Sequence, residues 1–99
     1  ERILSMIYHV ALSSSARRYL KRLRYSGTFN PPVFNTILQC FEHGKALPEK
    51  FKDHQLHGEF AHLRECHLGF NLLLIYKRND DAKIITISDI GTHGELFGE

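Results

Sequence analysis

Histidine is the residue type that stands out in this 99-residue sequence, which contains seven of them. Four fall within a short stretch and a fifth follows the last apolar segment: His54, His57, His62, His67 and His93. Imidazole titrates near neutral pH, so this set predicts acid–base chemistry or metal binding. We expect no catalytic role for His9 and His43, which lie outside this set of five.

RNA cleavage is the acid–base chemistry that these residues favour. Attack of a ribose 2′-hydroxyl on the adjacent phosphate needs a base, an acid for the leaving oxygen and positive charge near phosphorus. Histidines can make both proton transfers, and Arg64, Lys50 and Lys52 can supply the charge. No phosphate-binding glycine loop, nucleophile elbow or His-Glu-x-x-His motif indicates a competing reaction.

A zinc site is the alternative use of the same residues. The pairs His54-x-x-His57 and His62-x-x-x-Cys66 are loosely similar in spacing to four zinc ligands. However, the sequence has no Cys-x-x-Cys pair, and Cys66 and His67 point to opposite faces of a predicted strand. We therefore expect no metal and no other cofactor.

The elements that must position these groups form one predicted α+β domain over residues 1–99. Apolar runs and alternation predict strands at 6–12, 59–68, 71–77 and 83–90. Cap residues and apolar stripes predict one helix between Ser13 and Gly27 and a second between Asn30 and Gly44. Residues 45–58 are predicted as a basic loop, and 91–97 as a loop with at most one helical turn.

This β-α-α-β-β-β order separates the helices from most of the strands. It predicts two N-terminal helices packed on one face of a largely antiparallel four-stranded sheet. The first helix has an apolar stripe and a basic outer face, formed by Arg17, Arg18, Lys21, Arg22 and Arg24.

Composition limits the class of protein further. The chain is 42% hydrophobic and 24% charged with a net charge of +2, which is typical of a folded domain and permits binding to nucleic acid. No apolar run approaches the roughly 18 residues that span a bilayer, so we expect no membrane association. Two cysteines and no secretory signal pattern predict a reduced, cytoplasmic location.

Several motifs resemble a known family over about the last 55 residues. The segment at 47–58, LPEKFKDHQLHG, resembles the LP-x-x-(Y/F)-x-D-H-x-L-x-G segment of the YafQ branch of the RelE superfamily, which contains ribonuclease toxins of bacterial toxin–antitoxin pairs. The sequence at 64–67, RECH, is similar to that branch's R-(D/E)-x-H. The sequences LLIYK at 73–77 and GTHGELF at 91–97 follow in the expected order.

The resemblance implies an RelE-like fold and an enzyme that cuts mRNA in the ribosomal A site, held inactive by a cognate antitoxin. It implies contact with operator DNA only through the antitoxin complex. His54, His67 and His93 match the family's catalytic histidines, Arg64 its arginine near the scissile phosphate, and Phe97 its C-terminal aromatic residue. Our hypothesis has His54 and His93 exchange protons while His67 supports the phosphate or the base.

The remaining predicted RNA contacts are Lys50, Lys52, Asn71 and, on the first helix, Arg17, Lys21 and Arg24, whose alternative role is solubility alone. Asn71 departs from the family, because relatives usually carry an aspartate there and an amide cannot accept a proton. It favours a second hypothesis, a non-cleaving module that binds its antitoxin or ribosomal RNA. A DNA-gyrase poison on the same scaffold fits the histidine set less well.

Overall fold

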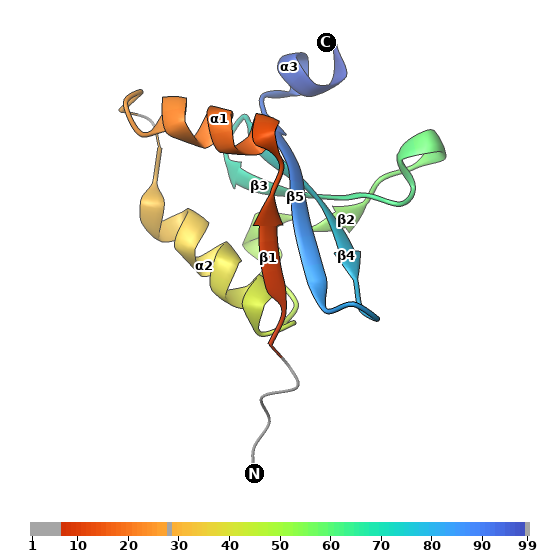
Figure 1. Cartoon of the computed structure of the whole chain (residues 1–99). Coiled ribbons are helices and arrows are strands. Elements are labelled where there is room, and N and C mark those ends of the chain that lie inside the picture. The colour runs from red at the N-terminus through yellow and green to blue at the C-terminus, as the bar shows by residue number, and fades with distance from the viewer. Residues whose placement is uncertain (1–6, 28, 99) are drawn as a thin grey trace.

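The computed structural model of the chain describes residues 7–27 and 29–98 (Figure 1). It has a five-stranded mixed sheet in the order β1-β5-β4-β3-β2. The strands are β1 (His9–Leu12), β2 (His54–Gln55), β3 (Arg64–Gly69), β4 (Leu72–Asn79) and β5 (Ile84–Gly91). The α+β prediction is confirmed. Met6, placed in the first strand from the sequence, lies outside the described residues.

The sheet differs from the predicted one at both edges. β1 pairs with β5 in parallel, from His9 opposite Ile84 to Leu12 opposite Ile87, and the other pairs are antiparallel. The fifth strand, β2, consists of two residues inside the segment predicted as a basic loop. A strand this short has too few residues to show an alternating pattern, and its polar side chains are exposed, so the sequence carries no signal for it.

The helices begin where their capping residues predict. α1 (Ser14–Leu23) starts after Ser13, whose side chain accepts a hydrogen bond from the Ala16 amide, and α2 (Pro31–Glu42) starts after Asn30. α1 ends before Gly27, which adopts a positive φ of 77° in the turn that follows. α3 (His93–Phe97) is the helical turn expected near the C-terminal end of the chain.

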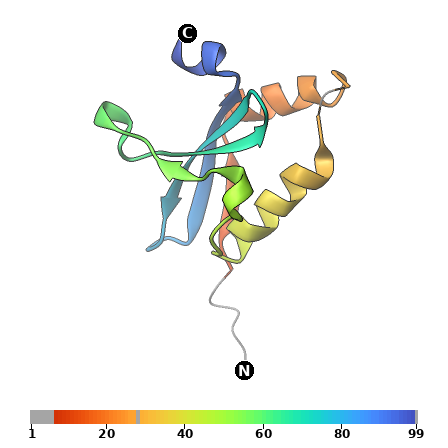
Figure 2. The same cartoon turned by 180° about the vertical axis from the view of Figure 1, so that it is seen from behind.

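Two short 3₁₀ helices complete the order of elements, η2 (Glu49–Phe51) and η3 (Gly58–Phe60). η3 occupies the start of the strand predicted over 59–68, and β3 begins only at Arg64. The chain therefore forms a projecting loop between β2 and β3, which Figure 2 shows from behind.

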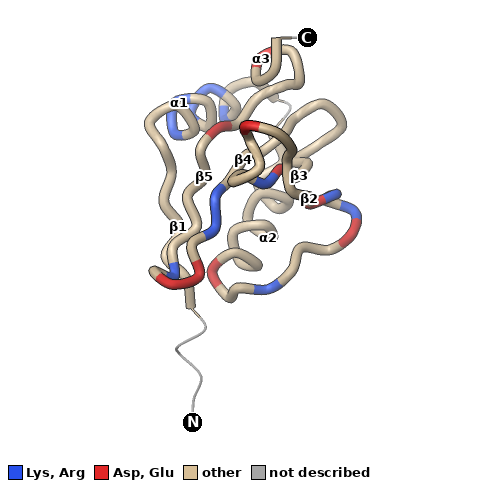
Figure 3. The backbone as a smooth tube through the Cα atoms, turned by 90° about the vertical axis from the view of Figure 1, so that its right-hand side faces the viewer, with Lys and Arg blue, Asp and Glu red and all other residues tan. Residues whose placement is uncertain are grey.

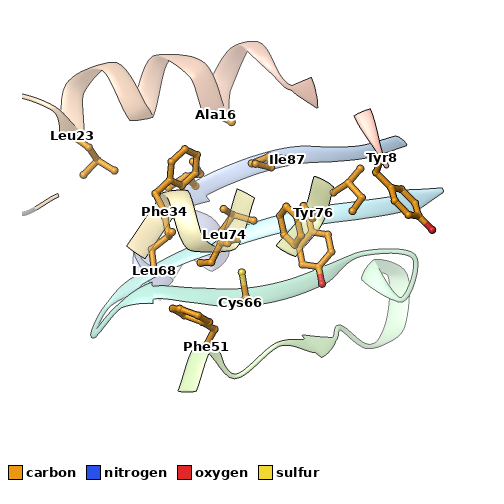
Figure 4. Packing of buried hydrophobic residues seen from close by; sticks show 14 residues of the cluster. Tyr8, Ala16, Leu23, Phe34, Phe51, Cys66, Leu68, Leu74, Tyr76 and Ile87 are labelled. Carbon is orange, nitrogen blue, oxygen red and sulfur yellow. The ribbon is translucent and has the colours of Figure 1, made fainter. Parts of the chain in front are cut away.

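The hydrophobic core lies between the sheet and the two long helices. α1 and α2 contribute Ala16, Leu23, Phe34, Ile37 and Phe41 to the same buried cluster as residues of β3, β4 and β5 (Figure 4). The rings of Phe41 and Tyr76 lie 4.5 Å apart between centroids. In the described part of the chain, no helix has the length and apolar character needed to cross a membrane.

Candidate functional site

β3 directs its alternate side chains to the two faces of the sheet, and this alternation divides the site from the core. Cys66 and Leu68 belong to the core cluster, so Glu65 and His67 lie on the opposite face. Cys66 is fully buried, and this burial raises the pKa of its thiol well above the ordinary value. Cys66 and His67 therefore lie on opposite faces of the sheet. This separation is the reason why we expect no zinc ion bound by both residues.

His54 is held by two oxygen atoms. Its Nδ1 lies 2.8 Å from the carbonyl oxygen of Lys52, and its Nε2 lies 3.2 Å from Oε1 of Glu65. The pairing of β2 with β3 places His54 directly opposite Glu65, whose side chain is only 7% exposed. Both ring nitrogens of His54 therefore face oxygen atoms of the protein.

His67 lies close to the other charged groups of the site. Burial lowers the pKa of His67, and the positive charges of Lys52, His54 and His93 lower it further, while Glu65 opposes them. The neighbours that act on His67 thus come from β2, β3 and α3 and the residues beside them. At neutral pH the His67 imidazole is uncharged and able to accept a proton.

His93 is the first residue of α3, and the cap of that helix fixes its position. The amide of Glu95 donates to the Thr92 hydroxyl over 3.2 Å, and the Glu95 carboxylate accepts from the Thr92 amide over 2.8 Å. The Tyr19 hydroxyl also donates to Glu95, over 2.6 Å, which ties α3 to α1. Nδ1 of His93 lies 3.3 Å from Oδ1 of Asn71, so Asn71 contacts a predicted catalytic histidine.

An aromatic pair lies beside His93. Phe97 makes a nearly perpendicular contact with Phe60 of η3, with ring centroids 6.4 Å apart, and lies at the same centroid distance from His93. Sequence reasoning missed Phe60, because its short 3₁₀ helix was read as part of a strand. It also missed Glu65, although the strand alternation that relates Glu65 to His67 was available as a signal.

Lys50 and Lys52 lie at the other end of the site. Both line a hollow of about 520 Å³ that is open to solvent and also reaches His67. Lys50 lies over the ring of Phe51, 5.3 Å from its centroid, and Phe51 is buried in the core. The structure therefore brings the two lysines together with His67.

The structure does not place Arg64 among the histidines. Its position on β3 puts it on the core side with Cys66, and its Nε lies 3.2 Å from Asp53 Oδ1 and 3.3 Å from the Tyr76 hydroxyl. Tyr76 donates to the same Asp53 oxygen over 2.6 Å. Burial and the hydrogen bond to Asp53 raise the pKa of Tyr76, so it remains a donor. Arg64 thus holds the residue directly before His54.

The basic residues of α1 lie on another part of the surface. Arg17, Lys21 and Arg24 are exposed on the outer side of this helix, and Figure 3 shows the positive charges along it. Their connection to the histidines is indirect, through the bond from Tyr19 to Glu95 of α3. Among residues 7–27 and 29–98, no three His, Cys, Asp or Glu side chains are grouped so that they could hold a metal ion.

The comparisons with known proteins identify the family of the chain. The family model for the bacterial toxin of type II toxin–antitoxin systems, YafQ, matches residues 8–98. The mRNA interferase toxin YafQ of Escherichia coli strain K12 is 40% identical over 89 residues, covering 90% of this chain and 84% of the relative. The putative toxin YafQ of Haemophilus influenzae is 32% identical over 62 residues, covering 61% of each chain.

Two solved structures share the fold over 92% of this chain. A metal-bound toxin from Helicobacter pylori superposes with a TM-score of 0.82 at 28% identity, over 100% of its chain. The toxin of the E. coli DinJ-YafQ toxin-antitoxin complex superposes with a TM-score of 0.80 at 25% identity, over 98% of its chain. The matched family model covers nearly all of the described residues, and the chain belongs to the YafQ family of toxins from bacterial type II toxin–antitoxin systems.

Proposed function

We propose that this chain is an mRNA interferase that cuts ribosome-bound mRNA in the A site, through the 2′-hydroxyl of the RNA and without a metal. The observation that carries the proposal is the grouping of His54, His67 and His93 from three separate segments. We call these three residues with Glu65 and Asn71 the histidine cluster. Cleavage of this kind needs an acid and a base that act together, and the cluster offers both.

His67 is the proposed base. Its lowered pKa keeps the imidazole free of a second proton at pH 7, so it accepts the proton of the attacking 2′-hydroxyl. The 2′-oxygen then bonds to phosphorus, and the bond from phosphorus to the 5′-oxygen breaks. The products are an RNA end with a 2′,3′-cyclic phosphate and a second RNA with a free 5′-hydroxyl.

His93 is the proposed acid that protonates the leaving 5′-oxygen. Asn71 accepts a hydrogen bond from Nδ1 and so orients the ring, which leaves Nε2 to donate its proton to the substrate. This differs from the initial hypothesis, in which His54 and His93 exchange protons. The reason for the change is that both ring nitrogens of His54 already face protein oxygens.

His54 and the two lysines are proposed to stabilise negative charge. The pairing of His54 with Glu65 puts its ring on the face of the sheet that carries His67, where a proton on the imidazole would add positive charge near the phosphate. Lys50 and Lys52 border the hollow that reaches His67, where they can bind phosphates of the RNA on either side of the cut. Arg64 is a positioning residue, because it holds Asp53 next to His54.

The biological setting follows from the family. The E. coli relative has been solved in complex with DinJ as a toxin–antitoxin pair, and we propose that a cognate antitoxin likewise binds and inhibits this chain. Operator DNA would be bound only through that complex. We propose that residues 1–99 act as one domain in the bacterial cytoplasm, where ribosomes present mRNA.

Primer extension on a translated message, with pure protein and ribosomes, tests the proposal. We expect cuts with the wild type and none with His93→Ala, while His57→Ala, a change of an exposed histidine outside the cluster, cuts normally. Cleavage should persist when EDTA is added, because imidazoles make both proton transfers. Loss of cutting with EDTA would favour a metal mechanism. A wild type that binds ribosomes without cutting would favour the non-cleaving module.

A further inference from the structure

Phe70 occupies an unusual place for a large apolar side chain. It lies in the turn between β3 and β4 and has a relative exposure of 102%, the highest of the large hydrophobic side chains in residues 7–27 and 29–98. Its neighbours Gly69 and Asn71 are residue types that form turns readily, so the turn does not need an aromatic residue. Because the ring is fully exposed, it also contributes no burial to the folded state.

The Phe70 side chain borders two hollows that share Leu68 and Gly69 as well. One hollow, of about 320 Å³, includes Asn71, which contacts His93. The other, of about 520 Å³, includes Lys50, Lys52 and His67. Phe70 therefore borders both a space lined by Asn71, the residue that contacts the proposed acid, and a space lined by the proposed base.

We infer that Phe70 stacks on a base of the single-stranded RNA substrate next to the scissile phosphate. Aromatic side chains stack on bases of any sequence, and nearby lysines hold the phosphates, which is the usual combination for single-stranded nucleic acid. The inference rests on the proposed function and adds a positioning residue to it. Stacking at this point aligns the 2′-hydroxyl with His67 and the leaving oxygen with His93.

The charge around the ring favours RNA over a protein partner. Two lysines border one of the hollows, and no acidic side chain lines either of them. A phosphate backbone is attracted to such a surface. An acidic antitoxin segment is the competing occupant, and the experiment distinguishes the two.

Cleavage of ribosome-bound mRNA by Phe70 variants is the first measurement. We expect Phe70→Ala and Phe70→Leu to lower kcat/KM about tenfold, because both remove the stacking face, while Phe70→Trp retains at least half of the wild-type value. Tyr25→Ala is the matched control, since Tyr25 is 84% exposed in the turn after α1 and lines neither hollow. It should cut like the wild type.

Tryptophan fluorescence is the second measurement. The chain contains no tryptophan, so Phe70→Trp introduces a single reporter. Titration with a short oligouridylate should quench it, and an abasic oligonucleotide of equal length should not, because only a base can stack. Tyr25→Trp should respond to neither.

Three results would overturn the inference: a Phe70→Leu variant that cuts within twofold of the wild type, equal quenching by the abasic strand, or a Phe70→Ala variant that cuts normally but escapes inhibition by the antitoxin. The last result would assign Phe70 to the antitoxin interface. If the wild type does not cut at all, the proposed function is wrong, and the fluorescence titration still decides whether Phe70 stacks on RNA.

Discussion

The ring of His93 is held by Asn71 through a contact of 3.3 Å between Nδ1 and Oδ1. The amide oxygen orients the imidazole but carries no full negative charge, so it stabilises the protonated ring less than a carboxylate would. In this chain Asn71 therefore orients the imidazole of the proposed acid, His93, but stabilises its positive charge only weakly.

Asn71→Asp should extend activity to higher pH. A carboxylate in place of the amide keeps His93 protonated over a wider range, so we expect the alkaline limb of the pH–rate profile to move up by about one unit. Cleavage rates between pH 5 and 9 on ribosome-bound mRNA measure this shift, with Asn79→Asp at the end of β4 as a control. An alkaline limb that stays in place would exclude His93 as the acid.

His67 should make the stability of the fold depend on pH in a defined direction. Its pKa is lower in the folded protein than the ordinary value of 6.5, so below about pH 6.5 the unfolded chain binds more protons. The stability that neutral His67 provides is present above that pH and is lost as the pH falls through the folded pKa. Thermal melts should show the wild type losing stability relative to His67→Gln between pH 7 and 5. A wild type that gains stability relative to His67→Gln on acidification would contradict the shift.

Arg64 and Asp53 should behave as one unit. If Arg64 acts by holding Asp53, then Arg64→Ala and Asp53→Ala each slow cleavage, and the double variant is hardly slower than either. We expect a coupling energy of about 1–2 kcal/mol in a double-mutant cycle on cleavage rates. If the losses in cleavage rate of the two single variants are fully additive, Arg64 acts on the scissile phosphate instead, as the family resemblance implies.

The basic face of α1 should contribute to ribosome binding through charge alone. Replacing Arg17, Lys21 and Arg24 with glutamine should lower the slope of log K against log salt by about one for each lost phosphate contact. Ribosome binding measured over a series of KCl concentrations gives this slope, with Lys45→Gln as a control away from this helix. An unchanged slope would leave the face with a role in solubility only.

The antitoxin should stabilise the toxin by mass action. A partner that binds only the folded state at 100 times its Kd adds about 2.7 kcal/mol, which raises the melting temperature of a domain of this size by about 10–20 °C. Differential scanning fluorimetry with the purified cognate antitoxin measures the shift, and a non-cognate antitoxin is the control. No shift with the protein encoded next to this chain would argue against the toxin function.

Local patterns predicted the elements well, because capping residues and side-chain periodicity depend on near neighbours in sequence. Ser13 and Asn30 cap the helices as expected, and the apolar runs became β4 and β5. The parallel pairing of β1 with β5 was not predicted, since it joins residues more than seventy positions apart. No local pattern specifies which of several strands becomes the neighbour of β1.

Only part of the site could be predicted, because sequence patterns do not report contacts between residues that are far apart in the chain. The histidines carried a motif, but the direction of Arg64 follows from its position on β3, which places it with Cys66 and away from His67. Its partner Asp53 belongs to the motif that contains His54, but its contacts with Arg64 and Tyr76 could not be predicted, because they join residues from separate segments of the chain. Phe60 could not be found from the sequence, since its role depends on a loop that reaches Phe97.

The pairing of β1 with β5 has a consequence for the order of events during synthesis. β1 is translated before its partner residues 84–87, which lie in the strand that precedes the helix carrying His93. A nascent chain shorter than this cannot close its sheet. Such a chain also lacks the acid that we propose for cleavage. We therefore expect the ribosome that makes this toxin to be exposed to its activity only after residues 84–93 have been translated.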